Sequence, residues 1–184
     1  MEILNQLLAI DINYIVASLI VLYFLMENLF ATQFKFNKMP QHPLHNIMIQ
    51  VMLTVGGYFT AIVLVSAIDW LSLHRVGILH YVNMPVWAKL LLGVAAFDFT
   101  NYWFHHMVHR VPLLWRFHRA HHSDTRMDAS TNLRSQPVEL LIYFGIANLV
   151  AASVFGLDVI ALSVFFLVIT PYVFREHTNI RFPH

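Results

Sequence analysis

The sequence has no cysteine and few charged residues. Without thiols, the chain cannot have a disulfide framework, a thiolate zinc site or a cysteine-ligated iron–sulfur cluster. Asp, Glu, Lys and Arg make up 11% of the 184 residues, against about 25% in an ordinary soluble domain. The formal net charge of +1 is too small for a nucleic-acid-binding protein, whose affinity comes from neutralising phosphates. These deficits argue against a water-soluble domain and against a nucleic-acid partner.

The residues that are abundant are apolar, aromatic and imidazole-bearing. Hydrophobic residues make up 58% of the chain, with 15 Phe, 7 Tyr and 4 Trp, which excludes intrinsic disorder. The mean hydropathy is +0.61. The 12 histidines outnumber the 11 Lys and Arg residues together. This composition indicates an integral-membrane protein that uses imidazoles to bind something.

Three apolar runs are long enough for membrane-spanning helices, since a bilayer core of about 30 Å takes roughly 20 residues. The runs are 12–34, 47–68 and about 86–104, the third starting after Pro85. The first contains a single charge, Glu27, and follows Glu2 and Asp11, so it lacks the basic start of a signal peptide. We therefore expect three retained spans.

Two shorter apolar runs, 140–155 and 159–174, follow a polar stretch and are separated by Gly156-Leu157-Asp158, a turn-forming sequence. A 16-residue helix is roughly 24 Å long, which is marginal for a crossing. A hairpin that enters and leaves on one side and two complete spans both remain open. The predicted fold is an all-α membrane bundle of three spans plus a hydrophobic helical hairpin. We divide it into N-terminal spans with their loops, 1–84, and a domain over 85–184.

Positive charge predicts which membrane side each loop faces. Nine of the eleven Lys and Arg residues would lie on one face of this arrangement, whereas Arg75 and Lys89 fall in or near the loop after the second span. The positive-inside rule assigns the basic face to the cytoplasm. The histidines between 105 and 122, and His177, fall on that same face.

Five of the six histidines between positions 105 and 122 form the most informative pattern. His105 and His109 are four residues apart, which places them on one face of a helix. His118, His121 and His122 have the spacing i, i+3, i+4 and would converge if their segment is helical. Such a cluster predicts a metal site, although imidazole binds iron, copper, zinc and nickel alike. For the isolated histidines, a polar role at the headgroup boundary is the simpler interpretation: His42, His45, His74, His80 and His184.

Asp98 and Tyr102 continue the stripe of His105 toward the membrane. A carboxylate inside a span is costly, so we predict that Asp98 orients an imidazole N–H, with a general polar role as the alternative.

The histidine motifs resemble those of the fatty acid hydroxylase superfamily, which includes the sterol desaturases. The first is Asp98-Phe-x-x-Tyr-Trp-x-His105-x-x-x-His109, and the second is Pro112-x-Leu-Trp-Arg-Phe-His118-x-x-His121-His122. The match continues through Arg134, Pro137 and Glu139, and a later element reads His177-Thr-Asn-Ile180. The resemblance covers the chain from about Pro85 onward.

This resemblance implies a membrane-bound, iron-dependent enzyme that activates O2 and hydroxylates or desaturates a lipid. It implies a di-iron centre on the cytoplasmic face, a membrane lipid as substrate and a separate electron-donor protein. The implied metal ligands are His105, His109, His118, His121, His122 and His177. Gln136 stands where the family has a histidine in an Arg-x-His-Pro element. Its amide can hydrogen-bond there but is a poor iron ligand, so we group it with Asp98 and Tyr102 as a residue behind the ligands.

A third family box, of the form HxxHH, would follow the His-Asn-Ile element but is not present before His184. We therefore expect an incomplete reading frame, and an inactive remnant that inserts in membranes and at most binds a metal ion stays open as the alternative. A haem-binding electron-transfer protein fits less well, because the histidines gather at one membrane face. A metalloprotease is disfavoured because no HExxH motif occurs.

Overall fold

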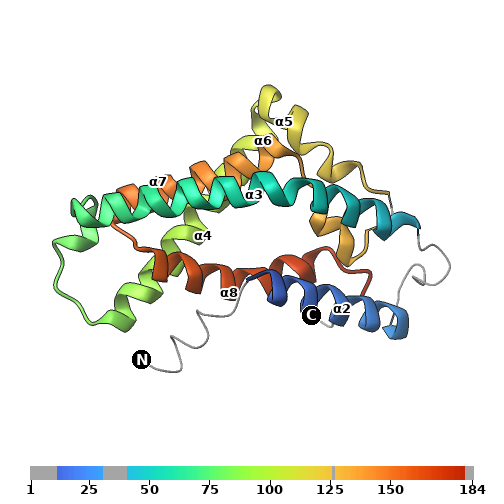
Figure 1. Cartoon of the computed structure of the whole chain (residues 1–184), viewed down its shortest axis with the longest axis horizontal. Coiled ribbons are helices and arrows are strands. Elements are labelled where there is room, and N and C mark those ends of the chain that lie inside the picture. Colours follow the sequence, from blue (N-terminus) through green and yellow to red (C-terminus); the bar gives the residue numbers. More distant parts are fainter. Residues whose placement is uncertain (1–11, 31–40, 126, 181–184) are drawn as a thin grey trace. The chain divides into compact units, whose positions relative to one another are not determined.

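The computed structural model describes residues 12–30, 41–125 and 127–180, and these ranges contain helices and no β-strand (Figure 1). This confirms the all-α prediction. The α-helices are α2 (Ile12–Phe30), α3 (Gln41–Leu73), α4 (Val86–Arg110), α5 (Pro112–His118), α6 (Pro137–Leu140), α7 (Asn148–Phe155) and α8 (Val159–Glu176). Three short 3-10 helices, η2 (Ile78–His80), η3 (His121–Ser123) and η4 (Ala129–Leu133), and a π-helix, η5 (Leu141–Ala147), complete the described elements.

Three of the described helices are long and apolar enough to cross a membrane, which makes this a membrane protein. They are Pro43–Leu73 within α3, the continuous helix Pro137–Phe155 formed by α6, η5 and α7, and α8. Both halves of the predicted hairpin are therefore long enough for complete spans. Each exceeds its apolar run because helix continues into flanking residues, as at Pro137–Glu139.

The other two predicted spans are helical but are not among these three. α4 covers the predicted run and continues six residues beyond Phe104. Its polar side chains, including Lys89, Asp98 and Asn101, lower its mean hydropathy. α2 covers 12–30 of the predicted span, whereas residues 31–34 lie outside the described residues.

The chain forms two compact units, each built from segments that are distant in sequence. Unit 1 comprises residues 1–52, 120–135 and 167–184, and unit 2 comprises 53–119 and 136–166. In unit 1, α2 packs on η4 and on the end of α8. Its hydrophobic core has Ala129, Leu133 and Phe174 at the centre, and the Tyr23 ring stacks on Phe174 with centroids 6.0 Å apart.

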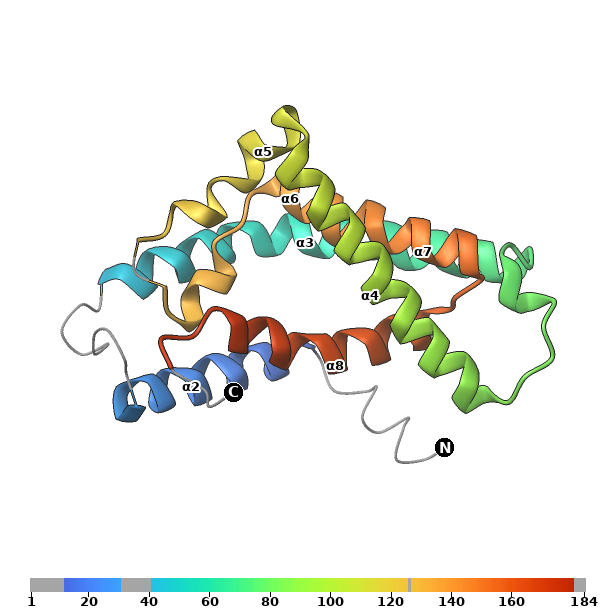
Figure 2. The same ribbon diagram turned by 180° about the vertical axis from the view of Figure 1, so that it is seen from behind.

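In unit 2, α7 runs beside the C-terminal half of α3, and α4 crosses α7 (Figures 1 and 2). Small residues allow the close approaches. A Cβ added to Gly93 of α4 would lie 2.9 Å from Cβ of Ala161 in α8, and Phe97 stacks on Phe165 one turn further along, with centroids 5.5 Å apart. Gly145 allows η5 to approach Thr60 of α3 in the same way.

The Val111-Pro112 sequence creates the bend that matters for the site. A proline disfavours the α conformation of the residue before it, and Val111 is accordingly extended, with φ −90° and ψ 114°. α4 therefore ends at Arg110, and Pro112 starts α5 at the first helical position, where proline is favoured. The chain turns between His109 and His118, which lets these two imidazoles meet.

The loop after α3 contacts the end of α7 through two glycines with positive φ. Gly77 has φ +107° and Gly156, the residue after α7, has φ +75°. A Cβ on Gly77 would lie 2.1 Å from the backbone nitrogen of Gly156. Backbone cannot give way as a side chain does, so only glycine fits at position 77.

Gly77→Ala should therefore destabilise the protein by about 3 kcal/mol, because strained backbone and a forced shift of Gly156 add together. Gly56→Ala is the matched control, since an added Cβ meets nothing within 4 Å inside α3, and its stability should be unchanged or slightly raised. Thermal unfolding in detergent followed by circular dichroism measures both. Equal unfolding temperatures for the two variants would contradict the described loop contact.

Candidate metal centre

Three imidazoles from α4 and α5 converge in unit 2. Nε2 of His109 lies 3.2 Å from Nε2 of His105 and 3.2 Å from Nε2 of His118, and one ring nitrogen from each lies within 4.8 Å of the others. We call His105, His109 and His118 the three-histidine cluster. Two nitrogens bound at ~2.1 Å to one tetrahedral ion would be about 3.4 Å apart. The spacing therefore fits ligands of a common metal ion.

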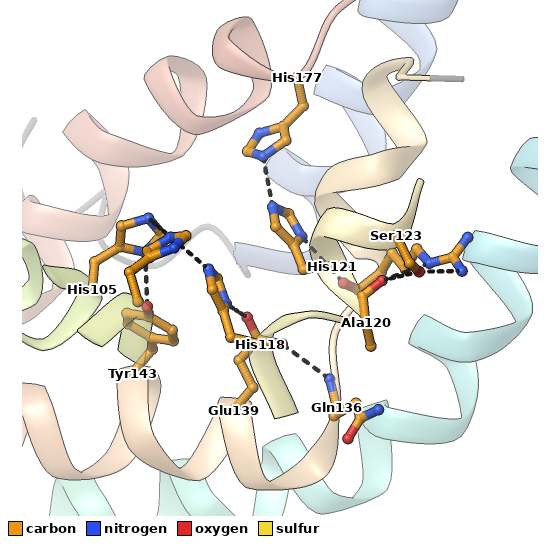
Figure 3. Close-up of polar contacts among 11 residues, drawn as sticks. His105, His118, Ala120, His121, Ser123, Gln136, Glu139, Tyr143 and His177 are labelled. Atoms are coloured by element: carbon orange, nitrogen blue, oxygen red, sulfur yellow. Dashed lines mark hydrogen bonds and ion pairs between the residues drawn. The ribbon is translucent and has the colours of Figure 1, made fainter. Parts of the chain in front are cut away.

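The opposite ring nitrogens of two of these histidines are held by side chains from the Pro137–Phe155 helix (Figure 3). Nδ1 of His118 lies 2.6 Å from Oε1 of Glu139, and Nδ1 of His105 lies 2.7 Å from the Tyr143 hydroxyl. A carboxylate only accepts hydrogen bonds, so Nδ1 of His118 carries the proton and donates it. Nε2 of His118 then presents its lone pair to the cluster, as metal binding requires.

Glu139 is itself fixed by the start of its helix. It is the third residue of α6, and it forms a capping box with Gln136, the residue before the helix. The Gln136 backbone N–H donates to Oε2 of Glu139 at 3.4 Å, and the Gln136 side chain accepts from the Glu139 backbone N–H. His118 and Glu139 are both buried. The helix start thus sets the position of the carboxylate that orients His118.

Burial lowers the pKa of His109, and the neighbouring His118 and His106 lower it further. An imidazole with a lowered pKa is neutral at pH 7, and the neutral form is the one that binds metal ions. Burial and the neighbouring imidazoles of His118 and His106 therefore favour the neutral, metal-binding form of His109 over its protonated form.

A second pair of imidazoles lies in unit 1. Nε2 of His121 lies 2.8 Å from Nε2 of His177, and both Nδ1 atoms face backbone carbonyls. The His121 Nδ1 lies 3.2 Å from the Arg134 oxygen, and the His177 Nδ1 lies 2.8 Å from the Val173 oxygen. We call His121 and His177 the histidine pair. His122 is exposed, with its ring centroid 5.3 Å from that of His121.

The structure corrects the helical interpretation of the His118, His121 and His122 spacing. α5 ends at His118 and a 3-10 turn begins at His121, so the segment is not one α-helix. Within unit 1, Arg134 contributes to the non-helical path of the chain from Ala120 to Ser123. Its Nε donates to the Ala120 oxygen at 3.0 Å and its Nη2 to the Ser123 hydroxyl at 2.9 Å. The Ala120 carbonyl is thereby engaged by a side chain 14 residues away.

Glu27 of α2 holds the two loops that carry the histidine pair. Its side chain is 2% exposed, and Oε1 accepts from the backbone N–H of Ala129 at 2.9 Å and of Asn179 at 2.7 Å. Ala129 begins η4, and Asn179 follows His177 by two residues. Glu27, the single charged residue of the first apolar run, thus accepts hydrogen bonds from backbone N–H groups and does not face lipid.

The predicted role of Asp98 is not supported by its position. Asp98 is exposed and makes no hydrogen bond or ion pair within the described ranges. It precedes His105 by seven residues, or about 10.5 Å along the helix axis, so the shared face does not bring them into contact. Tyr102 is also exposed, and its ring stacks on His106 with centroids 6.4 Å apart. Gln136 contacts Glu139, which in turn contacts His118.

Sequence reasoning missed the roles of Glu139, Tyr143 and Glu27. Glu139 and Tyr143 are spaced i, i+4 after Pro137, which marks two polar groups on one face of an apolar helix. That pattern could have indicated a second element facing the histidines. Glu27 was noticed only as a lone charge, and nothing local identifies its backbone partners.

Comparison with known proteins agrees with these motifs. The family model described as fatty acid hydroxylase matches residues 90–184, inside the predicted segment 85–184. No solved structure matches the chain.

Three curated relatives are each described as an alkylglycerol monooxygenase. The protein from Homo sapiens is 32% identical over 103 residues, which cover 54% of this chain and 22% of the relative. The Xenopus tropicalis protein is 34% identical over 77 residues, covering 40% and 17%. The Danio rerio protein is 32% identical over 89 residues, covering 44% and 19%. The chain thus matches about a fifth of the length of these relatives.

Glu27→Leu should destabilise the protein by about 2 kcal/mol, because two buried backbone N–H groups lose their acceptor. Glu27→Gln keeps an acceptor oxygen and should recover most of the loss. Thermal unfolding in detergent gives the stabilities, and hydrogen exchange at the amides of Ala129 and Asn179 locates the effect.

The control is Leu29→Ala, an exposed position on the same helix, which should leave both amides protected. If Glu27→Leu exchanges these amides no faster than the unmodified chain, the anchoring role of Glu27 is wrong.

Proposed function

The chain belongs to the fatty acid hydroxylase family, and from this membership we propose that it is a membrane-bound, iron-dependent oxidoreductase that hydroxylates or desaturates a lipid with O2. The observation that carries the proposal is the shared orientation of the imidazoles. In both histidine groups the Nε2 atoms face one another, and four Nδ1 atoms are held by oxygen atoms. Histidine ligands of metals have this arrangement.

The residues present fit metal ions held by nitrogen ligands. We propose that the three-histidine cluster holds one iron ion, that the histidine pair contributes ligands to a second, and that His122 is a further ligand. Imidazole suits iron but does not select it over zinc or copper. The family membership supports iron, which supplies the O2-activating chemistry that no side chain can provide.

The chain's own residues then orient and protect the site. Glu139 keeps the proton of His118 on Nδ1, and the Tyr143 hydroxyl, which can accept or donate a hydrogen bond, holds Nδ1 of His105 in place. Hydroxylation converts a C–H bond into C–OH and one oxygen atom of O2 into water, which consumes two electrons and two protons. We propose that a separate electron-donor protein supplies these electrons.

We propose that the substrate is a membrane lipid that approaches from the bilayer. α4 exposes aromatic side chains in the turns before His105, namely Phe99, Tyr102 and Trp103. The similarity to alkylglycerol monooxygenases supports an alkylglycerol as the first lipid to test. We further propose that the histidines face the cytoplasm, a placement supported by the positive charges near them.

The metal claim predicts two iron ions per chain after anaerobic loading with Fe(II) in detergent, measured by elemental analysis. Replacing His118 with alanine should remove one ion, and replacing His121 should remove the other. Glu139→Gln should weaken iron binding at the three-histidine cluster about 10- to 100-fold, because the amide no longer fixes the His118 proton as a carboxylate does.

Glu176→Gln makes the same chemical change at an exposed position in α8 and serves as the control. Absence of iron from the loaded, folded chain would contradict the proposal. Iron binding unaffected by the His118 and His121 substitutions would contradict the ligand assignment.

The reaction claim predicts that the iron-loaded chain, given a chemical reductant and 18O2, places one 18O atom in an alkylglycerol. Mass spectrometry of the extracted lipid measures the label, and a fatty acid and a sterol tested in parallel define the substrate class. An unsaturated product without label would indicate desaturation. No product from any of the three lipids with both irons bound would contradict the enzyme proposal.

A further inference from the structure

Two polar contacts join α4 to the Pro137–Phe155 helix within unit 2. Nδ2 of Asn101 donates to Oδ1 of Asn148 at 2.9 Å, and one helical turn later His105 meets the Tyr143 hydroxyl. The second contact orients a residue of the three-histidine cluster. The first has no direct contact with a histidine and lies in an otherwise apolar region.

The two contacts have unequal spacing along their helices. Asn101 and His105 are four residues apart, which is one α-helical turn, whereas Asn148 and Tyr143 are five residues apart. The five-residue spacing falls in the π-helix η5, whose hydrogen bonds run i→i+5. An α-helical register would have placed Phe144, four residues before Asn148, opposite His105. The π-helical turn allows Tyr143 to occupy that place.

Asn148 is the residue that holds this turn. Its side chain is 1% exposed, and Nδ2 donates to the carbonyl oxygens of Tyr143 and Phe144, each at 3.0 Å. Oδ1 of Asn148 accepts the hydrogen bond from Asn101. Asn101 is itself fixed because its Nδ2 also donates to the Phe97 oxygen at 2.8 Å. Every polar atom of the Asn148 side chain is thus engaged, as a buried amide requires.

In this register Phe144 packs against α8. Its ring stacks on Phe166 of α8, with centroids 5.2 Å apart. The π-helical turn therefore separates two neighbouring side chains, so that Phe144 packs against α8 and Tyr143 contacts His105. π-helical turns are often found at functional sites.

We propose that Asn148, oriented by Asn101, is a positioning residue for the metal centre. It fixes the π-helical turn that places the Tyr143 hydroxyl at Nδ1 of His105, and thereby directs Nε2 of His105 toward the ion. This inference rests on the proposed metal-binding function, but the position of the His105 proton can be measured without metal.

The first measurement is the 15N spectrum of the His105 imidazole in the metal-free full chain, which reports which ring nitrogen carries the proton. Tyr143→Phe removes the hydroxyl alone, and Asn148→Leu removes the amide while keeping a similar volume. Both should shift the His105 tautomer in the same direction, and the double variant should match the single ones. Ser153→Ala on α7 is the control, because within the described ranges the Ser153 hydroxyl donates only to the nearby Val150 oxygen.

The second measurement is Co(II) binding, followed by its visible absorption bands, in a chain where His121 and His177 are replaced by alanine. Tyr143→Phe and Asn148→Leu should each weaken Co(II) binding about 10-fold or more and shift the bands. Because the two residues act in series, the double variant should bind no more weakly than the weaker single variant.

A His105 tautomer unchanged in Asn148→Leu would overturn the inference, as would losses in Co(II) affinity that multiply in the double variant. If Asn148→Leu does not fold, Asn101→Leu, at a partly buried position, should give the same tautomer shift. A chain that binds no Co(II) but shows the tautomer shifts would instead contradict the metal-binding function, with the positioning role of Asn148 intact.

Discussion

An imidazole offers a metal ion one nitrogen only when its proton is held on the other, and this constraint organises the structure. In the three-histidine cluster and the histidine pair, four imidazoles have Nδ1 beside an oxygen atom: His105, His118, His121 and His177. The oxygen comes from a phenol, a carboxylate or a backbone carbonyl, so the chemistry differs while the geometry is the same. The elements around each histidine group serve to bring those oxygens to the rings.

Two buried glutamates, Glu139 and Glu27, connect the two histidine groups to the apolar helices. Glu139 contacts an imidazole directly, and Glu27 accepts from two backbone N–H groups in the loops that carry the histidine pair. Burying a carboxyl group is costly unless it is hydrogen-bonded. Both oxygens of Glu139 have a partner, whereas Glu27 has two partners at Oε1 and, within the described residues, none at Oε2. α2 lies before the residues matched by the family model, yet its Glu27 takes part in holding His177. Residues outside the recognised family segment therefore belong to the structural basis of the candidate site.

Local sequence patterns predicted where the helices lie better than they predicted which side chains contact one another. Apolar runs located the helical segments because a helix in a bilayer must be apolar over its length. The spacing of His105 and His109 placed their rings together because both lie on one α-helix. The HxxHH spacing would bring three rings together only in one continuous α-helix, and α5 ends at His118. Asp98 was assigned by the same periodic reasoning, but a stripe on a helix says nothing about what reaches it from another helix. The π-helical turn at Tyr143 cannot be recognised from a hydrophobic period of 3.6 residues.

The sequence by itself determined that the chain is an all-α membrane protein with clustered imidazoles, because hydropathy and i, i+4 spacing act over a few residues. Only the tertiary structure decided which groups orient those imidazoles. The partners of His118, His105 and His177 are Glu139, Tyr143 and His121, which lie 21, 38 and 56 residues away. Glu27 and Asn179 are 152 residues apart. Hydrogen bonds need distances near 3 Å and suitable angles, and across such separations those follow from how the helices pack and not from the order of residues.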